Sequence, residues 1–419
     1  MATCASSTAG SRAEQDSAAA VRYVVRQPIL DLRSKVHAYE LLFSNGPETS
    51  MRSDGEAAIR AMIDNTVVFG LAKLTCGLPA FVKCTEDALA GTLVEMLPSG
   101  MTVLEIQESA EPSPTLVAAC RNLRAAGYRL ALKQSVWKPE IQPLVEAASY
   151  IKVDFSATDP PGRRKLLTRL NGMNVALIAE KVETQEQFSQ ARDEGFALVQ
   201  GYYFCRPVML ENRKVPANRL SQVQILRMLQ GESIDLHRLA QLVKRDASLT
   251  FRLLRLINSP ACAMQQEVHS VQGALLAVGE ETFRRMAAVA ITSDLNAGQP
   301  TELLRMAFVR GRFCELAARL CGLDCTEQYL LGLMSLLPAM LRVPMNELAP
   351  MLPLRQEVRR ALLGDQTKER NLLKWLEGYE LGDWEGCDTI SGAIELSREG
   401  MLQCYQDAAS WAESAMYFA

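Results

Sequence analysis

The sequence predicts a βα barrel followed by an all-helical domain. Between residues 22 and 207, short apolar runs alternate with segments of helical period, and eight strands fit this region. Polar side chains stand where these strands end, and in α/β barrels the carboxyl ends of the strands carry the chemistry. From Arg219 onward, apolar residues recur almost only at helical spacing, which predicts a second domain without strands.

Length and composition agree with two globular domains. The chain has 419 residues, which is long for a single core, and its residues are 48% hydrophobic and 22% charged. A net charge of -3 gives no general attraction to nucleic acid or to an anionic membrane surface. The 11 cysteines are scattered, no secretory signal or long apolar run is evident, and we expect a cytoplasmic protein with reduced thiols. Cys321 and Cys325 are interpreted as two small residues on one helical turn rather than a metal pair.

The first domain is expected to span residues 21–208, after a disordered tail at residues 1–20 that is rich in Ala, Ser and Thr. Residues 23–30 and 37–43 predict two strands of a hairpin, and an apolar stripe predicts a helix at residues 56–74. Further strands are expected at 81–82, 102–106, 129–132, 150–153, 175–178 and 198–200, with helices at 89–97, 116–126, 163–170 and between Glu183 and Gly195.

The second domain is expected to span residues 219–419, after a polar connector at residues 209–218. Ser270 is expected to cap a helix at residues 271–278 that Gly279 ends. Other helices are predicted between 219 and 257 and at 280–291, 302–320, 327–341, 346–348, 354–363, 370–379 and 390–411, with a polar turn at 384–386.

Nine polar residues are predicted at the strand ends of the barrel: Gln27, Glu40, Lys83, Glu105, Lys133, Lys152, Asp154, Glu180 and Gln200. Three or more acidic side chains that converge there would suit divalent metals and the cleavage of a phosphate ester. The alternative for Glu180 and its neighbour Glu183 is that they are solvated loop charges.

Residues 22–207 resemble the EAL domain, the barrel family of cyclic di-GMP phosphodiesterases. The matching segments are Gln27-Pro28-Ile29, Tyr39-Glu40-Leu41-Leu42, Leu104 to Glu108, Ile151 to Asp154, Ala179 to Glu183, and Gln200-Gly201-Tyr202 through Arg206-Pro207. The resemblance implies an EAL-type, TIM-like barrel. The residues that match the family pattern are Glu40, Glu105, Lys152, Glu180 and Gln200, and the candidates for binding a nucleotide are Gln27, Lys152, Glu180 and Gln200.

Several positions depart from that family. Active members hold two divalent cations with an Asn and an Asp-Asp pair, which here are Lys83 and Lys133-Gln134, and Ser44 stands for an Arg that grips a phosphate. A misplaced unit charge about 4 Å from a cation costs roughly 1–4 kcal/mol, depending on screening. We therefore expect no bound metal, no cofactor and no two-metal hydrolysis, and we expect Lys83 and Lys133 to neutralise the remaining glutamates.

The helical region resembles the HDOD domain, which shares its fold with HD phosphohydrolases but lacks their metal-binding dyad. The resemblance rests on Leu253 to Ser259 and Val271 to Gly279. The sequence agrees independently, because it has 3 His and none of them is followed by Asp.

Together, these features predict a catalytically inactive EAL–HDOD regulator of cyclic di-GMP pathways that acts through contacts with other signalling proteins. Two alternatives remain open: a receptor that binds cyclic di-GMP without hydrolysis, and a residual phosphodiesterase. A homodimer is expected by analogy, whereas contacts with membranes or nucleic acid are not.

Overall fold

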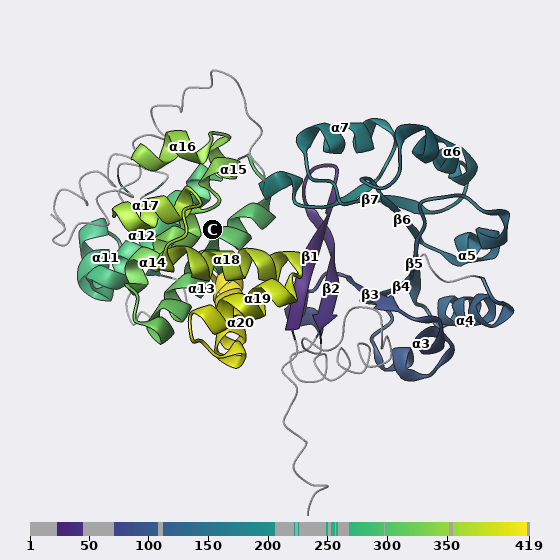
Figure 1. Ribbon diagram of the computed structural model, residues 1–419, viewed down its shortest axis with the longest axis horizontal. Helices are drawn as coiled ribbons and strands as arrows, with labels where there is room; N and C mark the ends of the chain where they lie inside the picture. The colour runs from purple at the N-terminus through teal and green to yellow at the C-terminus, as the bar shows by residue number, and fades with distance from the viewer. Residues whose placement is uncertain are drawn as a thin grey trace, which may run out of the picture.

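The computed structural model describes residues 23–44, 71–107, 112–205, 268–296, 298–351 and 355–416, with a few single positions between 222 and 258 (Figure 1). The expected tail, the connector, most of the helix at 56–74 and most of the helices between 219 and 257 lie outside these residues.

The barrel is confirmed. Its eight strands close in sequence order; β1 is antiparallel to both of its neighbours, β2 and β8, and every other pair is parallel. The strands are β1 (Tyr23–Asp31), β2 (Val36–Ser44), β3 (Ala80–Cys84), β4 (Thr102–Ile106), β5 (Arg129–Lys133), β6 (Tyr150–Asp154), β7 (Ala176–Glu180) and β8 (Leu198–Gln200). The predicted hairpin of the first two strands is present as the β1–β2 pair.

One apolar residue from each strand belongs to a packed layer in the interior of the barrel. This layer consists of Ile29, Ala38, Phe81, Val103, Ala131, Tyr150, Ile178 and Leu198. Side chains two residues apart on a strand share a face, so the next inward position on each strand belongs to a second layer. Those second positions are all polar, and they form the candidate site described below.

The α-helices that surround the barrel are α2 (Leu71–Leu74), α3 (Glu86–Ala90), α4 (Pro114–Ala125), α5 (Gln142–Ala147), α6 (Pro160–Leu170) and α7 (Gln185–Asp193). Short 3-10 helices are η1 (Leu93–Met96), η2 (Pro139–Ile141) and η3 (Tyr203–Cys205). The sequence carries clear start signals, since the side chains of Ser113, Asp159 and Thr184 cap α4, α6 and α7. The single helix expected at 89–97 is instead α3 followed by η1, and α5 was not expected.

The helical domain contains α11 (Val271–Val278), α12 (Glu280–Leu295), α13 (Thr301–Cys321), α14 (Cys325–Met334), α15 (Leu337–Leu341), α16 (Met345–Leu348), η5 (Ala349–Met351), α17 (Gln356–Leu362), α18 (Lys368–Leu381), α19 (Trp384–Ala393) and α20 (Arg398–Met416). As expected, Ser270 caps α11, and Gly279 ends it at a φ of 77°. None of the described helices is long and apolar enough to cross a membrane.

Four expectations for this domain were wrong. The helix expected at 327–341 is two helices, because Pro338 cannot share a helix with the carbonyl of Met334, where α14 ends. The predicted turn at 384–386 begins α19, which Asp383 caps. Cys321 and Cys325 do not share a helical turn, since Gly322 ends α13 between them.

The helix expected at 390–411 is also interrupted. Glu395 has a φ of 55°, and the N–H groups of Glu395 and Leu396 bond back to the carbonyls of Gly392 and Ser391. This pattern is a Schellman motif with Glu395 at the left-handed position, and it separates α19 from α20.

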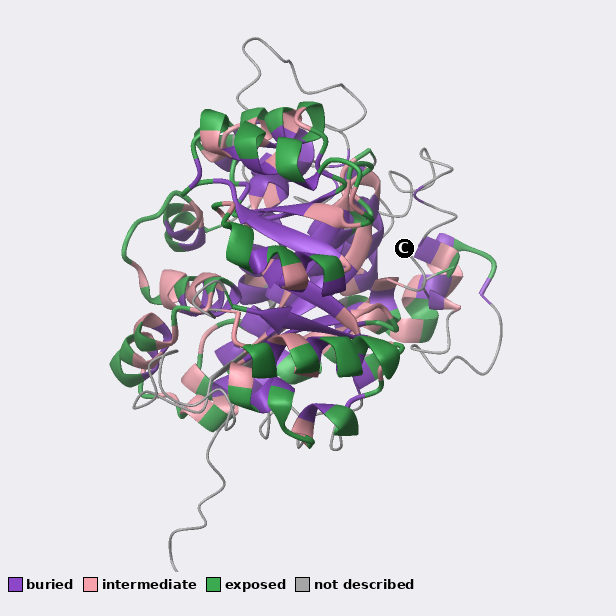
Figure 2. Ribbon diagram, turned by 90° about the vertical axis from the view of Figure 1, so that its right-hand side faces the viewer, coloured by how far each residue is buried: buried purple, intermediate pink, exposed green. Residues whose placement is uncertain are grey.

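The helical domain lies against the β1–β2 side of the barrel (Figure 1). Buried residues concentrate in the strands and on the inner faces of the helices (Figure 2). Tyr39 of β2 is 2% exposed, and its hydroxyl donates a 2.9 Å hydrogen bond to Glu302 of α13. Near the barrel rim, the Tyr202 hydroxyl donates to the Glu380 carbonyl of α18. The two domains are therefore joined by buried polar contacts as well as by apolar packing.

Candidate functional site

The polar layer of the barrel consists of eight residues, one from each strand: Gln27, Glu40, Lys83, Glu105, Lys133, Lys152, Glu180 and Gln200. Each belongs to the same strand as a residue of the apolar layer and lies two positions from it. Period-2 alternation therefore turns all eight toward one place. Eight of the nine polar residues expected at the strand ends belong to this layer, and Asp154 is the exception.

Lys152 is at the centre of the layer. Its side chain is 0% exposed, and its Nζ lies 2.7 Å from Glu40 Oε2, 2.6 Å from Glu105 Oε2 and 2.7 Å from Glu180 Oε1. A buried ammonium group is stable only when its charge is compensated and its N–H groups are paired. Here three carboxylates compensate the charge, and Glu40 and Glu105 also accept hydrogen bonds from Lys152.

Two further lysines flank the glutamates. Lys83 Nζ lies 2.8 Å from Glu40 Oε1. Lys133 Nζ lies 2.9 Å from Glu180 Oε2, close enough for an ion pair although the two are not aligned as a hydrogen bond. The ion pairs expected of Lys83 and Lys133 are therefore present. With three carboxylates and three ammonium groups, the formal charges of the layer cancel.

Two amides complete the layer on the β1 and β8 side. The Gln200 amide donates to Glu40 Oε2 at 2.6 Å and to Gln27 Oε1 at 2.8 Å. Glu40 is consequently bound from three directions, by Lys152, Lys83 and Gln200.

The pKa values differ between the two most buried carboxyl groups. Burial would raise the pKa of Glu40, but Lys152 and Lys83 hold it well below its ordinary value. Burial raises the pKa of Glu105 to about 7, because Lys152 offsets the burial only in part and the carboxylates of Glu40 and Glu180 oppose ionisation. Glu105 Oε1 has no hydrogen-bond partner among the described residues. Lys152 itself has a pKa well above the ordinary lysine value, because its three glutamates outweigh its burial.

The remaining candidates lie outside the polar layer. Asp154 pairs with Lys181 at 2.6 Å and accepts bonds from Ser156 and Ala157. The Gln134 side chain donates to the Val136 carbonyl in its own loop. Ser44 is the last residue of β2. Glu183, the other half of the loop-charge alternative, lies after β7 and is exposed, whereas Glu180 is 5% exposed.

The layer does not fit a pair of divalent cations. Glu40, Glu105 and Glu180 each offer a carboxylate oxygen within 4.8 Å of the others, which is close enough for one metal ion. However, Lys152 contacts all three groups, and Lys83 and Lys133 occupy the free sides of two of them. A cation placed among them would lie close to three ammonium groups, and this repulsion opposes binding.

The sequence did not reveal the residues that join this site to the helical domain. Tyr39 immediately precedes Glu40, and Tyr202 follows Gln200 by two residues, yet both contact helices rather than the polar layer. The alternation along β2 was a usable signal, because it turns Tyr39 away from the interior that Glu40 faces.

Comparisons with known proteins give a match to one domain family and a likeness to solved structures. The HDOD domain family matches residues 216–375. Among solved structures, the EAL domain of Mycobacterium smegmatis DcpA covers 43% of this chain and 91% of its own, with 18% identity and a TM-score of 0.36.

Two curated proteins match along nearly their whole length. Cyclic di-GMP phosphodiesterase CdgJ of Vibrio cholerae serotype O1 (strain ATCC 39315 / El Tor Inaba N16961) is 29% identical over 399 residues, which are 93% of this chain and 92% of CdgJ. Uncharacterized protein YuxH of Bacillus subtilis (strain 168) is 30% identical over 405 residues, which are 94% of this chain and 98% of YuxH. Since the identity to YuxH extends across both the barrel and the helical domain, the chain belongs to the same family as YuxH.

Proposed function

We propose that this protein is a regulator in cyclic di-GMP signalling whose barrel does not hydrolyse the dinucleotide. The observation that carries the proposal is the pairing of Glu40, Glu105 and Glu180 with Lys152, Lys83 and Lys133. The link to cyclic di-GMP is supported by the similarity to CdgJ, which is named as a cyclic di-GMP phosphodiesterase.

The neutralised negative charge of the three glutamates explains why hydrolysis is not expected. Metal-assisted cleavage of a phosphate ester needs cations that polarise the phosphoryl group and lower the pKa of an attacking water. Hard divalent cations bind where carboxylates are left uncompensated. Here, each carboxylate of the layer already has an ammonium partner within 2.9 Å.

We further propose that the helical domain acts by contacts with other signalling proteins, with the domains divided at residues 209–218. This part is supported by the sequence, in which none of the 3 His is followed by Asp, so that a His-Asp metal dyad is not available. A region that matches the HDOD domain family is thus left without the metal chemistry of the HD phosphohydrolases that the family resembles in fold.

A second candidate is a phosphodiesterase like CdgJ. It is favoured by the convergence of Glu40, Glu105 and Glu180 within 4.8 Å. Catalysis would require Lys83 and Lys133, whose side chains are 33% and 25% exposed, to swing out of the layer. A third candidate function is that of a receptor. In it, Gln27 and Gln200 at the barrel mouth would contact a nucleotide that is not cleaved.

The deciding experiment is calorimetric titration of cyclic di-GMP into the full chain, with and without Mg²⁺ or Mn²⁺, followed by assay for the linear dinucleotide. We expect no hydrolysis under any condition. Metal-dependent hydrolysis that Glu40→Gln abolishes would favour the phosphodiesterase and contradict the proposal. Binding without hydrolysis would assign a receptor, and absence of both would leave partner contacts as the function.

A further inference from the structure

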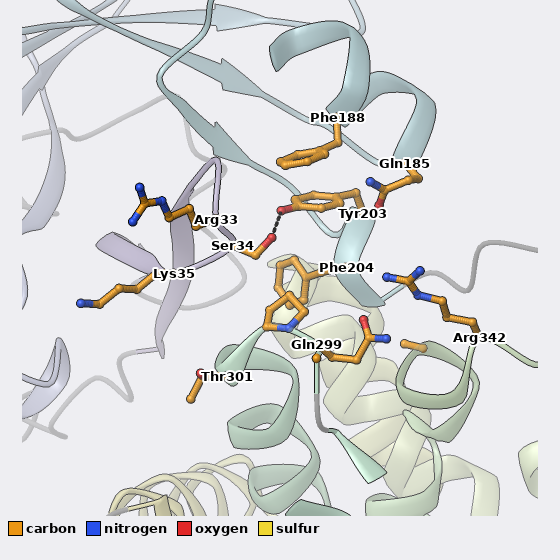
Figure 3. Close-up of a pocket in the computed structure, with 13 residues that line it drawn as sticks. Arg33, Ser34, Lys35, Gln185, Phe188, Tyr203, Phe204, Gln299, Thr301 and Arg342 are labelled. Atoms are coloured by element: carbon orange, nitrogen blue, oxygen red, sulfur yellow. Dashed lines mark hydrogen bonds between the residues drawn. The ribbon is translucent and has the colours of Figure 1, made fainter. Parts of the chain in front are cut away.

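A cavity lies at the junction of the two domains, away from the polar layer. It has a volume of about 530 Å³. The β1–β2 hairpin, the start of α7 and η3 form its barrel side, and the loop at residues 298–300 and the end of α15 form its helical side (Figure 3). This volume is typical of clefts that bind small molecules.

The described lining of this cleft is basic. Arg33, Lys35 and Arg342 line it together with neutral polar and apolar residues, and none of the described lining residues is acidic. Asp31 is a carboxylate on the same hairpin, and its Oδ1 already accepts the backbone N–H groups of Arg33 and Lys35 at 2.9 and 2.8 Å. Three positive groups around one cleft stand out in a chain whose net charge is -3.

Arg342 occupies a backbone position that normally belongs to glycine. It ends α15 with a φ of 57°, and the N–H groups of Arg342 and Val343 both bond to the Pro338 carbonyl. The left-handed residue of such a helix end is usually Gly, because a Cβ is disfavoured there. Figure 3 shows the Arg342 side chain extending from the helical domain toward Tyr203 and Gln185 of the barrel.

The barrel side of the cleft also carries a non-glycine residue with a positive φ. Ser34, at the tip of the hairpin, has a φ of 60°, in a turn where the Asp31 N–H donates to the Lys35 carbonyl and where Gly would be preferred. Its hydroxyl lies 3.2 Å from that of Tyr203, which stacks on Phe188 with ring centroids 4.6 Å apart. Two of the five non-glycine residues with positive φ in the described chain therefore line this one cleft. Side chains held at disfavoured φ concentrate at functional sites.

We propose that this cleft binds a small molecule that carries two or more phosphate charges. Arg342 would contact one anionic group from the helical side. Arg33 and Lys35 line the hairpin side of the cleft, and Figure 3 shows their side chains extending away from Arg342, so they would turn back toward the cleft to contact another anionic group. Guanidinium groups pair with phosphate oxygens through two parallel hydrogen bonds, which favours phosphate over a single carboxylate. Because the walls belong to both domains, the ligand would bridge them. This site is independent of the function proposed for the polar layer.

The test compares substitutions at two helix ends that each hold a non-glycine residue at positive φ. Arg342→Gly and Glu395→Gly each place glycine at the left-handed position, so both are expected to melt no lower than the parent chain. Arg121→Gln, at an exposed position of α4, controls for the loss of one positive charge. Inorganic pyrophosphate and ATP serve as probes in calorimetry at about 0.15 M salt, with citrate as the polycarboxylate comparison.

We expect Arg342→Gly to weaken the binding of pyrophosphate or ATP by about tenfold or more, while Glu395→Gly and Arg121→Gln change it by less than about twofold. Absence of binding of either phosphate probe at millimolar concentration overturns the proposal. Equal losses in Arg342→Gly and Arg121→Gln would also overturn it, because the effect would then be one of overall charge. Citrate that binds as tightly as pyrophosphate would contradict the phosphate assignment.

Discussion

The hydroxyl of Tyr39 lies 2.9 Å from Oε2 of Glu302, and this buried hydrogen bond joins the barrel to α13 of the helical domain. Tyr39 is adjacent to Glu40 on β2, so one strand faces the polar layer with one residue and the helical domain with the next. A displacement of β2 in response to a change at Glu40 would therefore alter the hydrogen bond between Tyr39 and Glu302. This arrangement gives the polar layer a short physical connection to the second domain.

Tyr39→Phe tests that connection. Removal of the hydroxyl leaves Arg305 as the one side chain among the described residues that bonds to Glu302. We expect a loss of about 2 kcal/mol in the free energy of unfolding, the usual cost for a buried bond to a charged group. Denaturant unfolding of the single variants and of the double variant with Glu302→Gln measures the coupling between the two residues. Tyr150→Phe is the control, because its hydroxyl makes only longer contacts of 3.3 and 3.4 Å within the barrel. Strictly additive effects of Tyr39→Phe and Glu302→Gln would contradict the connection.

Lys152→Met removes the central ammonium group and leaves three carboxyl groups around an apolar side chain. We expect a destabilisation of about 3–5 kcal/mol near neutral pH, because a buried charge is left without its partner. The exposed Lys165→Met is the control, with an effect within about 0.5 kcal/mol.

The pH dependence of Lys152→Met should be opposite in sign to the contribution that Glu40 makes in the parent chain. In the parent, the lowered pKa of Glu40 gives stability that is present above its unfolded pKa and lost as the pH falls through the acid range. Without Lys152, the raised glutamate pKa values make the variant more stable at mildly acidic pH than at alkaline pH. Urea unfolding at several pH values measures this, and a variant whose stability did not improve on acidification would contradict the central role of Lys152.

Glu105 is expected to titrate near neutral pH in the folded protein. Its pKa is raised to about 7, from an unfolded value of 4.5, so its contribution to stability falls as the pH rises between these values. The total loss over that interval is about 3 kcal/mol. Infrared spectroscopy should show a protonated carboxyl band that disappears as the pH is raised through 7 and that is absent in Glu105→Gln. The same variant should have a flatter stability profile in this range; an unchanged profile would show that Glu105 is ionised throughout.

The sequence predicted the barrel and eight residues of its polar layer because strand alternation is local. Glu40, Glu105 and Glu180 each follow an apolar residue by two positions, and the barrel topology brings them together. The partner of Tyr39 could not be predicted, because it depends on how a helix much later in the chain packs on the barrel. The end of α19 could not be predicted either. Glu395 adopts a left-handed conformation there, and Glu is not a residue type that indicates such a position.

The last prediction concerns the charge of the polar layer. Lys83→Asn with Lys133→Asp changes the formal charge of its eight residues from zero to minus three and exposes free carboxylate oxygens on Glu40 and Glu180. We expect this double variant to be less stable than the parent and to be stabilised by Mn²⁺ in thermal unfolding, as ligand binding to the folded state requires. Lys83→Gln with Lys133→Gln is the matched control, since it removes both positive charges without adding a carboxylate, and its response to Mn²⁺ should be weaker. If the double variant gained no Mn²⁺ binding by calorimetry, the lysines would not be what excludes metal, and the loop after Lys133 would be the remaining cause.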